Sequence, residues 1–280
     1  MRIVHESALY EPLPGSCFVT LTYRDRSECD EEQLRGGWHI PDDWSLQPDH
    51  FTRFMKRLRK RFAEQRIRFF QAGEYGNRCM HGIDLDRVGC PLCTVGRPHH
   101  HACLFNVAFP DLEVYTEFQG EPRYTSKVLE SVWKYGFVDV GKLTFESAAY
   151  VARYCLKKVT GPGADFHYYN CSLDGELTFL QPEYCTMSRR PGIGKEWYEK
   201  YKNDLFPRDE VPVPGSGVFK SMPRYYEELF AVEDPLSLEE IKEVRQRFMQ
   251  EHGAEYTPAR LMQKYQVKKA QIEQLRRNTV

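Results

Sequence analysis

The sequence predicts an α+β protein with a split βαβ antiparallel sheet, ferredoxin-like or RRM-like, with helices packed on one face. Two observations predict this class: the periodic segments follow the order β-α-β-β-α-β, and 280 residues with 41% hydrophobic content can bury one good core. The expected elements are strand 17–23, helix 49–65, strand 67–74, strand 99–107, helix 124–135, strand 137–143 and a further helix 146–158.

This topology has a consequence for strand neighbours. The first and third strands lie side by side in the centre, and the end of the second strand lies beside the start of the third. Glu74 at the end of one strand is therefore expected next to His99 and His101 at the start of another.

Composition narrows the class of protein. The formal net charge is −1, which argues against a general nucleic-acid coat protein, and no run of 18 apolar residues is available for a membrane span. Residues 1–6 contain no apolar signal core, so we expect a soluble protein of the bacterial cytoplasm without membrane partners. Most of its nine cysteines are then expected to be reduced thiols or metal ligands.

The first expected helix has a strongly basic face. Residues 53–68 carry eight Lys or Arg and a single acidic residue, with apolar side chains at helical spacing. An ordinary solvated face and a contact with the DNA backbone explain this pattern equally well. The candidate phosphate-binding residues are Arg57, Lys60 and Arg61.

A metal site is predicted from the segment that follows Arg97. Side chains two apart in a strand share a face, so His99 and His101 point the same way and His100 does not. Glu74 is the best third ligand and Gln71 the alternative. Two imidazoles and a carboxylate suit Mn²⁺ or Mg²⁺ with open positions for a phosphate oxygen, and Fe(II) for oxygen chemistry is the alternative.

Paired tyrosines favour phosphate chemistry over oxygen chemistry. Tyr150 and Tyr154 stand four apart and share one face of the expected helix. Lys157 falls on the same face and is a candidate catalytic residue, whereas Arg153 and Lys158 point sideways and are candidate DNA contacts. All three cations also complement a helix C-terminus.

A second metal site is predicted in the insert 77–96, between the second and third strands. A Cys-x-His pair and a Cys-x-x-Cys pair supply four ligands that suit tetrahedral Zn²⁺ in a structural role. They are Cys79, His81, Cys90 and Cys93.

Three motifs in order carry a family resemblance. Phe-Val-Thr-Leu-Thr-Tyr (18–23), His-His-His (99–101) and Tyr-Val-Ala-Arg-Tyr-Cys-Leu-Lys (150–157) resemble the motifs of HUH endonucleases that initiate rolling-circle replication. The two tyrosines, together with segments 69–76 and 188–194, resemble the replication initiators of gokushoviruses, small single-stranded DNA phages among the microviruses. The chain departs from the pattern at Arg153, where the family has lysine, and in the insert.

The resemblance implies the HUH endonuclease fold and a metal-dependent nickase and strand-joining enzyme. It would act on phage single-stranded and replicative-form DNA at the origin, through a 5′-phosphotyrosine intermediate. A host helicase and DNA polymerase are expected partners, since the chain has no Walker-type motif. The alternatives are an HUH transposase or relaxase, and a non-catalytic, metal-stabilised DNA-binding regulator.

The expected organisation is an endonuclease domain, 1–205, followed by a linker and a C-terminal helical region, 206–280. Within this region residues 236–250 and 258–277 predict two charged helices. Residues 168–188 predict a hairpin that extends the sheet.

Overall fold

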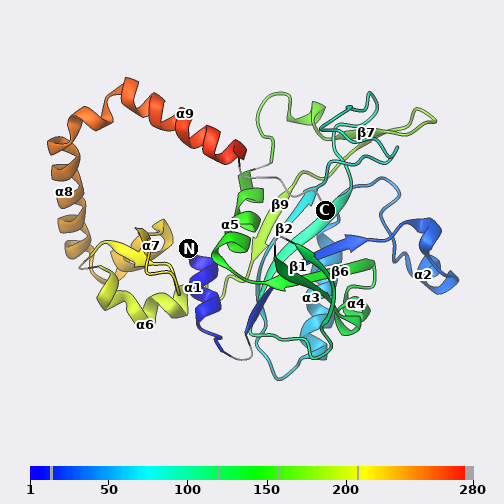
Figure 1. Cartoon of the computed structure of the whole chain (residues 1–280), viewed down its shortest axis with the longest axis horizontal. Coiled ribbons are helices and arrows are strands. Elements are labelled where there is room, and N and C mark those ends of the chain that lie inside the picture. Colours follow the sequence, from blue (N-terminus) through cyan, green and yellow to red (C-terminus); the bar gives the residue numbers. More distant parts are fainter. Residues whose placement is uncertain (13–14, 119, 157, 207, 275–280) are drawn as a thin grey trace. The chain divides into compact units, whose positions relative to one another are not determined.

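A computed structural model describes residues 1–12, 15–118, 120–156, 158–206 and 208–274 (Figure 1). Its largest element is a seven-stranded sheet with the order β4-β5-β6-β1-β3-β2-β9, and every pairing within it is antiparallel. The strands are β1 (Ser16–Tyr23), β2 (Arg68–Tyr75), β3 (Pro98–Phe105), β4 (Glu113–Phe118), β5 (Glu121–Thr125), β6 (Gly136–Lys142) and β9 (Tyr184–Met187). The prediction of a mixed α+β protein with an antiparallel sheet is confirmed.

The centre of the sheet has the predicted strand order. β3 lies between β1 and β2, and all eight residues of β3 are buried. A strand buried on both faces needs apolar or paired side chains in both directions. Leu104 faces one side of the sheet among aliphatic and aromatic side chains, and Cys103 and Phe105 face the other.

Helices cover both faces of this sheet (Figure 1). On one face lie the predicted helices α3 (Pro48–Arg61) and α4 (Lys127–Trp133), through buried side chains such as Phe54 and Trp133. On the other face lie α1 (Arg2–Ala8) and α5 (Phe145–Arg153). The prediction of helices on one face is therefore wrong for α1 and α5, because the strands alternate apolar side chains toward both sides.

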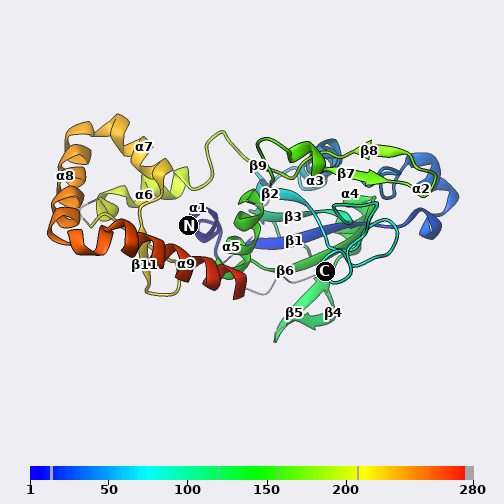
Figure 2. The ribbon, with the colours of Figure 1, turned by 90° about the horizontal axis from the view of Figure 1, so that it is seen from above.

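Several boundaries differ from the predicted ones. The expected helix 124–135 begins only at Lys127, and the residues before it form β5, which pairs with β4 in a hairpin that projects from the sheet (Figure 2). α5 ends at Arg153 and continues as a 3₁₀ turn, Tyr154–Leu156. The predicted hairpin forms as a separate pair, β7 (Tyr169–Cys171) with β8 (Leu177–Phe179), while β9 extends the main sheet beside β2.

The chain divides into two compact units. The first comprises residues 1–200 and 213–215, which include the main sheet and the short helix α2 (Glu31–Gly36). The second comprises residues 201–212 and 216 onward, and α6 (Lys195–Leu205) passes from one unit to the other. The other elements of the second unit are β10 (Glu210–Pro212), β11 (Phe219–Ser221), α7 (Arg224–Glu233), α8 (Pro235–Glu251) and α9 (Pro258–Gln274).

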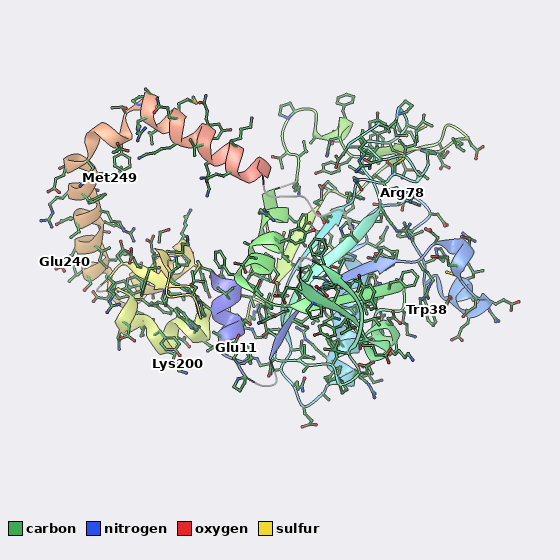
Figure 3. The ribbon with its side chains drawn as sticks, viewed as in Figure 1. Glu11, Trp38, Arg78, Lys200, Glu240 and Met249 are labelled. Atoms are coloured by element: carbon green, nitrogen blue, oxygen red, sulfur yellow. The ribbon has the colours of Figure 1, made fainter. Side chains whose placement is uncertain are left out.

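The two helices predicted near the C-terminus are α8 and α9. Both carry exposed apolar side chains, among them Met249 on α8, which is 50% exposed (Figure 3). Among the described residues, no helix is both long and apolar enough to cross a membrane.

Leu104 tests the core on which the sheet depends. It is fully buried in the central strand, so Leu104→Ala should lower the free energy of unfolding by about 2–5 kcal/mol, because the change removes buried methyl groups and leaves a cavity. Leu112→Ala is the control, since Leu112 is 39% exposed. Urea unfolding followed by tryptophan fluorescence measures the effect on the first unit, which contains all four tryptophans. Equal losses for the two variants would contradict the packing described.

Candidate metal centre and tyrosine site

Three candidate ligands meet where β2 and β3 pair. The register places Glu74 directly opposite His99 and Ala72 opposite His101, so the carboxylate and both imidazoles lie on one face of the sheet. Glu74 Oε1 lies 2.7 Å from His99 Nε2 and 2.8 Å from His101 Nε2. The predicted convergence of these three side chains is confirmed.

Hydrogen bonds on the far side of each imidazole orient both rings. His99 Nδ1 donates to the Arg97 carbonyl oxygen at 3.2 Å, and His101 Nδ1 lies 3.0 Å from Thr20 Oγ1. In neutral His99 the proton is therefore on Nδ1, and the bare Nε2 lone pair faces a carboxylate oxygen. Two such lone pairs this close repel each other unless a proton or a cation lies between them.

The donor set fits a divalent cation. Two imidazole nitrogens and one carboxylate oxygen suit Mn²⁺ or Mg²⁺, whose adjacent octahedral ligands lie about 3 Å apart. All three side chains are buried: Glu74 is 2% exposed and His101 is fully buried. Burial favours the neutral form of Glu74, but the charge of His99 and hydrogen bonds from His101 and His99 outweigh it and hold the pKa of this carboxyl well below its usual value.

The tyrosines reach this centre from α5. The helix begins with a capping box, in which Thr144 Oγ1 accepts from the Ser147 amide and Ser147 Oγ accepts from the Thr144 amide. This start fixes which side of α5 faces the sheet. Although the helix tightens into a 3₁₀ turn at Tyr154, Tyr150 and Tyr154 still contact each other edge to face, with ring centroids 4.9 Å apart.

Both tyrosine rings pack on the same metal-ligand candidate. Tyr154 stacks on His101 with centroids 5.0 Å apart, and Tyr150 meets the same imidazole edge-on at 5.3 Å. The prediction that a spacing of four brings both tyrosines to the metal-ligand face is confirmed.

The phenols differ in their surroundings. Burial raises the pKa of Tyr150 to about 12, although a hydrogen bond with Tyr154 and the positive charge of Arg153 partly offset it. Burial and the charge of Glu74 raise the pKa of Tyr154 further. Neither phenol ionises readily near pH 7 unless additional positive charge lies at the site.

The other predicted site residues are more dispersed. Gln71 faces the opposite side of the sheet from Glu74, because it is three positions away in the strand, and it bonds Thr186 Oγ1 at 2.8 Å. This position excludes Gln71 as the third ligand of the His99 and His101 centre. The Arg153 guanidinium lies 5.6 Å from the Tyr150 ring, Lys158 is exposed, and Lys157 lies outside the described residues.

The basic helix does not line this centre. α3 packs on the face of the sheet opposite to the one that carries Glu74 and the tyrosines. Arg57 donates to the carbonyl oxygens of Val132 and Trp133, at 2.6 and 3.0 Å, so its guanidinium caps α4. This makes Arg57 a structural residue, contrary to its predicted role, whereas Lys60 and Arg61 remain exposed on the far face.

Sequence reasoning missed two polar side chains of the site. Thr20 lies opposite His101 across the β1–β3 ladder and is 1% exposed. Its position in the first motif, two residues after Phe18, was the available signal. Arg123 could not have been found, because the sequence indicated a helix where β5 forms.

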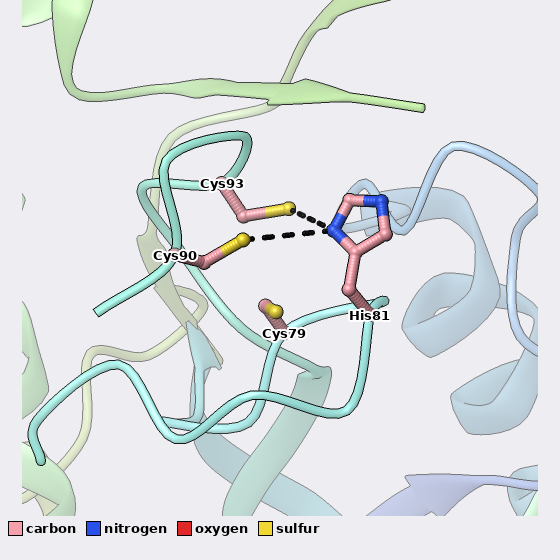
Figure 4. A group of neighbouring side chains, drawn as sticks. All are labelled: Cys79, His81, Cys90 and Cys93. Carbon is pink, nitrogen blue, oxygen red and sulfur yellow. Dashed lines mark hydrogen bonds between the residues drawn. The ribbon is translucent and has the colours of Figure 1, made fainter. Parts of the chain in front are cut away.

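The predicted four-residue cluster forms in the insert (Figure 4). One ligand atom from each of Cys79, His81, Cys90 and Cys93 lies within 4.8 Å of the others, and His81 Nδ1 is 3.3 Å from Cys93 Sγ. Three thiols and one imidazole are a ligand set typical of structural zinc. The loop that supplies them includes Arg78, labelled in Figure 3.

The cluster is tied to the hairpin of β7 and β8. The Cys171 amide donates to the Leu92 carbonyl oxygen at 2.7 Å, and Thr94 Oγ1 donates to the Tyr169 carbonyl oxygen at 2.9 Å. The insert and the hairpin thus form one module.

Comparison with known proteins places the chain in a family. Residues 16–82 and 92–159 match the family described under the replication-associated protein ORF2. The replication-associated protein ORF2 of Spiroplasma virus 4 is 32% identical over 82% of this chain and 63% of its own length. The replication-associated protein VP4 of Bdellovibrio phage phiMH2K is 30% identical, over 84% of this chain and 63% of its own length.

The chain belongs with the replication-associated proteins of microviruses. It spans a little under two thirds of the length of the two relatives described, and no solved structure matches it. The matched segments contain all five residues of the metal centre and the tyrosine pair, whereas Cys90 falls in the unmatched stretch between them.

Chelation tests the cluster in the insert. We expect protein purified without chelator to contain one zinc ion per chain, and Cys93→Ser to lose it, because a hydroxyl is a weaker zinc ligand than a thiolate. Elemental analysis and a thermal melt with and without a strong chelator measure this. Cys29→Ser is the matched control, since Cys29 is a half-buried free thiol outside the cluster. Zinc content that is equal in the two variants would contradict the assignment.

Proposed function

We propose that this protein initiates rolling-circle replication of a phage genome as an HUH endonuclease, a metal-dependent nickase that joins itself to single-stranded DNA. The observation that carries the proposal is the packing of two tyrosines on His101, an imidazole that shares Glu74 Oε1 with His99. The similarity to microvirus replication-associated proteins supports it. The central β1–β3–β2 ladder and the position of α5 are consistent with the HUH fold.

His99, His101 and Glu74 would hold Mn²⁺ or Mg²⁺ by Nε2, Nε2 and Oε1. When bound, the ion neutralises charge on the scissile phosphate and on the attacking oxygen. Thr20 and the Arg97 carbonyl hold the two imidazoles in place through their Nδ1 atoms, which keeps both Nε2 atoms directed at the centre.

A tyrosine hydroxyl supplies the nucleophile. Its oxygen bonds to phosphorus as the bond from phosphorus to the 3′ oxygen breaks, so the 5′ phosphate stays on tyrosine and the 3′ end leaves as a hydroxyl. The phosphotyrosine bond keeps the energy of the broken diester, so a later 3′ hydroxyl can reseal the strand without ATP. Two tyrosines allow one to hold an end while the other cuts the regenerated origin.

The proposal extends to partners and location. Substrates would be the single-stranded and replicative-form DNA of the phage at its origin, and Arg153 and Lys158 are the proposed backbone contacts near the tyrosines. Unwinding and synthesis would come from a host helicase and DNA polymerase in the bacterial cytoplasm.

Covalent capture of DNA tests the nucleophiles. Single-stranded oligonucleotides that tile the cognate genome, labelled at the 3′ end, are incubated with Mn²⁺ and run on a denaturing protein gel. We expect a protein-linked label in the wild type and a loss of at least about 1,000-fold when Tyr150→Phe and Tyr154→Phe are combined, because no phenol then remains. Tyr265→Phe, an exposed tyrosine of the second unit, is the control and should keep the adduct. Retained DNA binding without any adduct would instead favour a non-catalytic regulator.

His101→Ala tests the metal centre separately. Loss of one of three ligands should slow adduct formation by at least about 100-fold and raise the Mn²⁺ concentration needed for half the maximal rate. The control is His252→Ala, on an exposed helix end of the second unit. An unchanged Mn²⁺ titration for His101→Ala would exclude this residue as a ligand.

A further inference from the structure

A buried arginine outside the three motifs lies beside the tyrosine site. Arg123 belongs to β5, and its side chain is only 20% exposed. Its Nε donates to Asp139 Oδ1 on the neighbouring strand at 2.9 Å, and Nη2 donates to the second oxygen of the same carboxylate. This bidentate pair holds the guanidinium in one orientation.

The surroundings of Arg123 connect it to the proposed chemistry. Its Cζ lies 5.3 Å from the centroid of the Phe18 ring. The same ring stacks on His101 at 5.6 Å and meets Tyr150 edge to face at 6.2 Å. One aromatic side chain therefore touches the arginine, a metal-ligand candidate and a tyrosine.

One side of the guanidinium remains available. Among the residues that the structure describes, Arg123 hydrogen-bonds only Asp139, through Nε and Nη2. Nη1 lies over Gly141, where a Cβ atom would come within 2.7 Å of it. A glycine at this position gives the guanidinium room, and Nη1 is left to donate to a ligand.

The two tyrosines differ in their relation to positive charge. Tyr150 is half-buried, has Arg153 5.6 Å from its ring, and shares the Phe18 contact with Arg123. Tyr154 is 5% exposed and stacks flat on His101, with its hydroxyl bonded to Glu74. A phosphate that approaches these guanidinium groups therefore meets Tyr150 first.

We propose that Arg123 binds the scissile phosphate beside Tyr150 and makes Tyr150 the tyrosine that attacks first. The assignment rests on the proposed nickase function. In the first step Tyr150 Oη bonds to phosphorus and the bond to the 3′ oxygen breaks. The phenolic proton passes to water, and the departing oxygen takes up a proton to become a 3′ hydroxyl. Arg123 neutralises charge on a non-bridging oxygen and exchanges no proton.

Single-turnover adduct formation at saturating DNA tests the order of the tyrosines. Tyr154→Phe should form the first adduct within about threefold of the wild-type rate, whereas Tyr150→Phe should lose at least about 100-fold. Equal rates for the two variants, or a greater loss for Tyr154→Phe, would overturn the assignment.

Arg123→Gln tests the phosphate contact. We expect its rate at saturating DNA to fall by about 100-fold with an unchanged melting temperature, and Arg123→Lys to recover part of the loss, because it restores the charge without the planar fork. In the Tyr150→Phe background, Arg123→Gln should cause no further loss. The matched control is Arg24→Gln, since Arg24 follows the end of β1 that is far from Phe18 and lies 5.6 Å from the Phe137 ring.

The outcomes separate the two proposals. A rate for Arg123→Gln equal to the wild-type rate overturns this assignment and leaves the nickase in place. A loss of rate that follows a lowered melting temperature and is not recovered by lysine makes Arg123 structural and also overturns it. Absence of a wild-type adduct on every oligonucleotide overturns the proposed function and, with it, the role of Arg123.

Discussion

The alignment of β3 between β1 and β2 is the constraint on which the site depends. It places His99 opposite Glu74, and Thr20 opposite His101, without any contribution from the loops. A shift of one residue in either ladder would turn the partner side chain to the other face of the sheet. Burial of β3 on both sides makes such a shift costly, because every side chain of the strand would leave its packing environment.

Burial on both faces also separates two jobs. The face under α3 and α4 is an aliphatic and aromatic core, and His100 lies within it, with Nε2 3.3 Å from Tyr23 Oη. Its desolvation lowers the pKa of His100 to about 3, so it stays neutral there. The opposite face combines the metal-ligand candidates with the tyrosines on α5. Consecutive histidines thus serve packing and chemistry through the alternation of strand side chains alone.

The insert that carries the cysteines connects the two strands that supply the metal-ligand candidates. β2 ends at Tyr75, just after Glu74, and β3 begins at Pro98, just before His99. A loop of this length between paired strands costs conformational entropy on folding. A zinc ion held by Cys79, His81, Cys90 and Cys93 would restrict the loop, while the strands set the ligand register.

The sequence by itself determined the central strands, the predicted metal-ligand triad and the four-residue cluster, because alternation in a strand and the spacing of Cys and His are local properties. Tertiary structure alone decided the rest. Whether residues 121–125 begin a helix or form β5 depends on the neighbouring β6, and with it depends the place of Arg123. Arg57 looked like part of an open basic face, and only the position of α4 showed that its guanidinium binds two carbonyl groups. Long-range packing selects among local possibilities that are nearly equal in free energy.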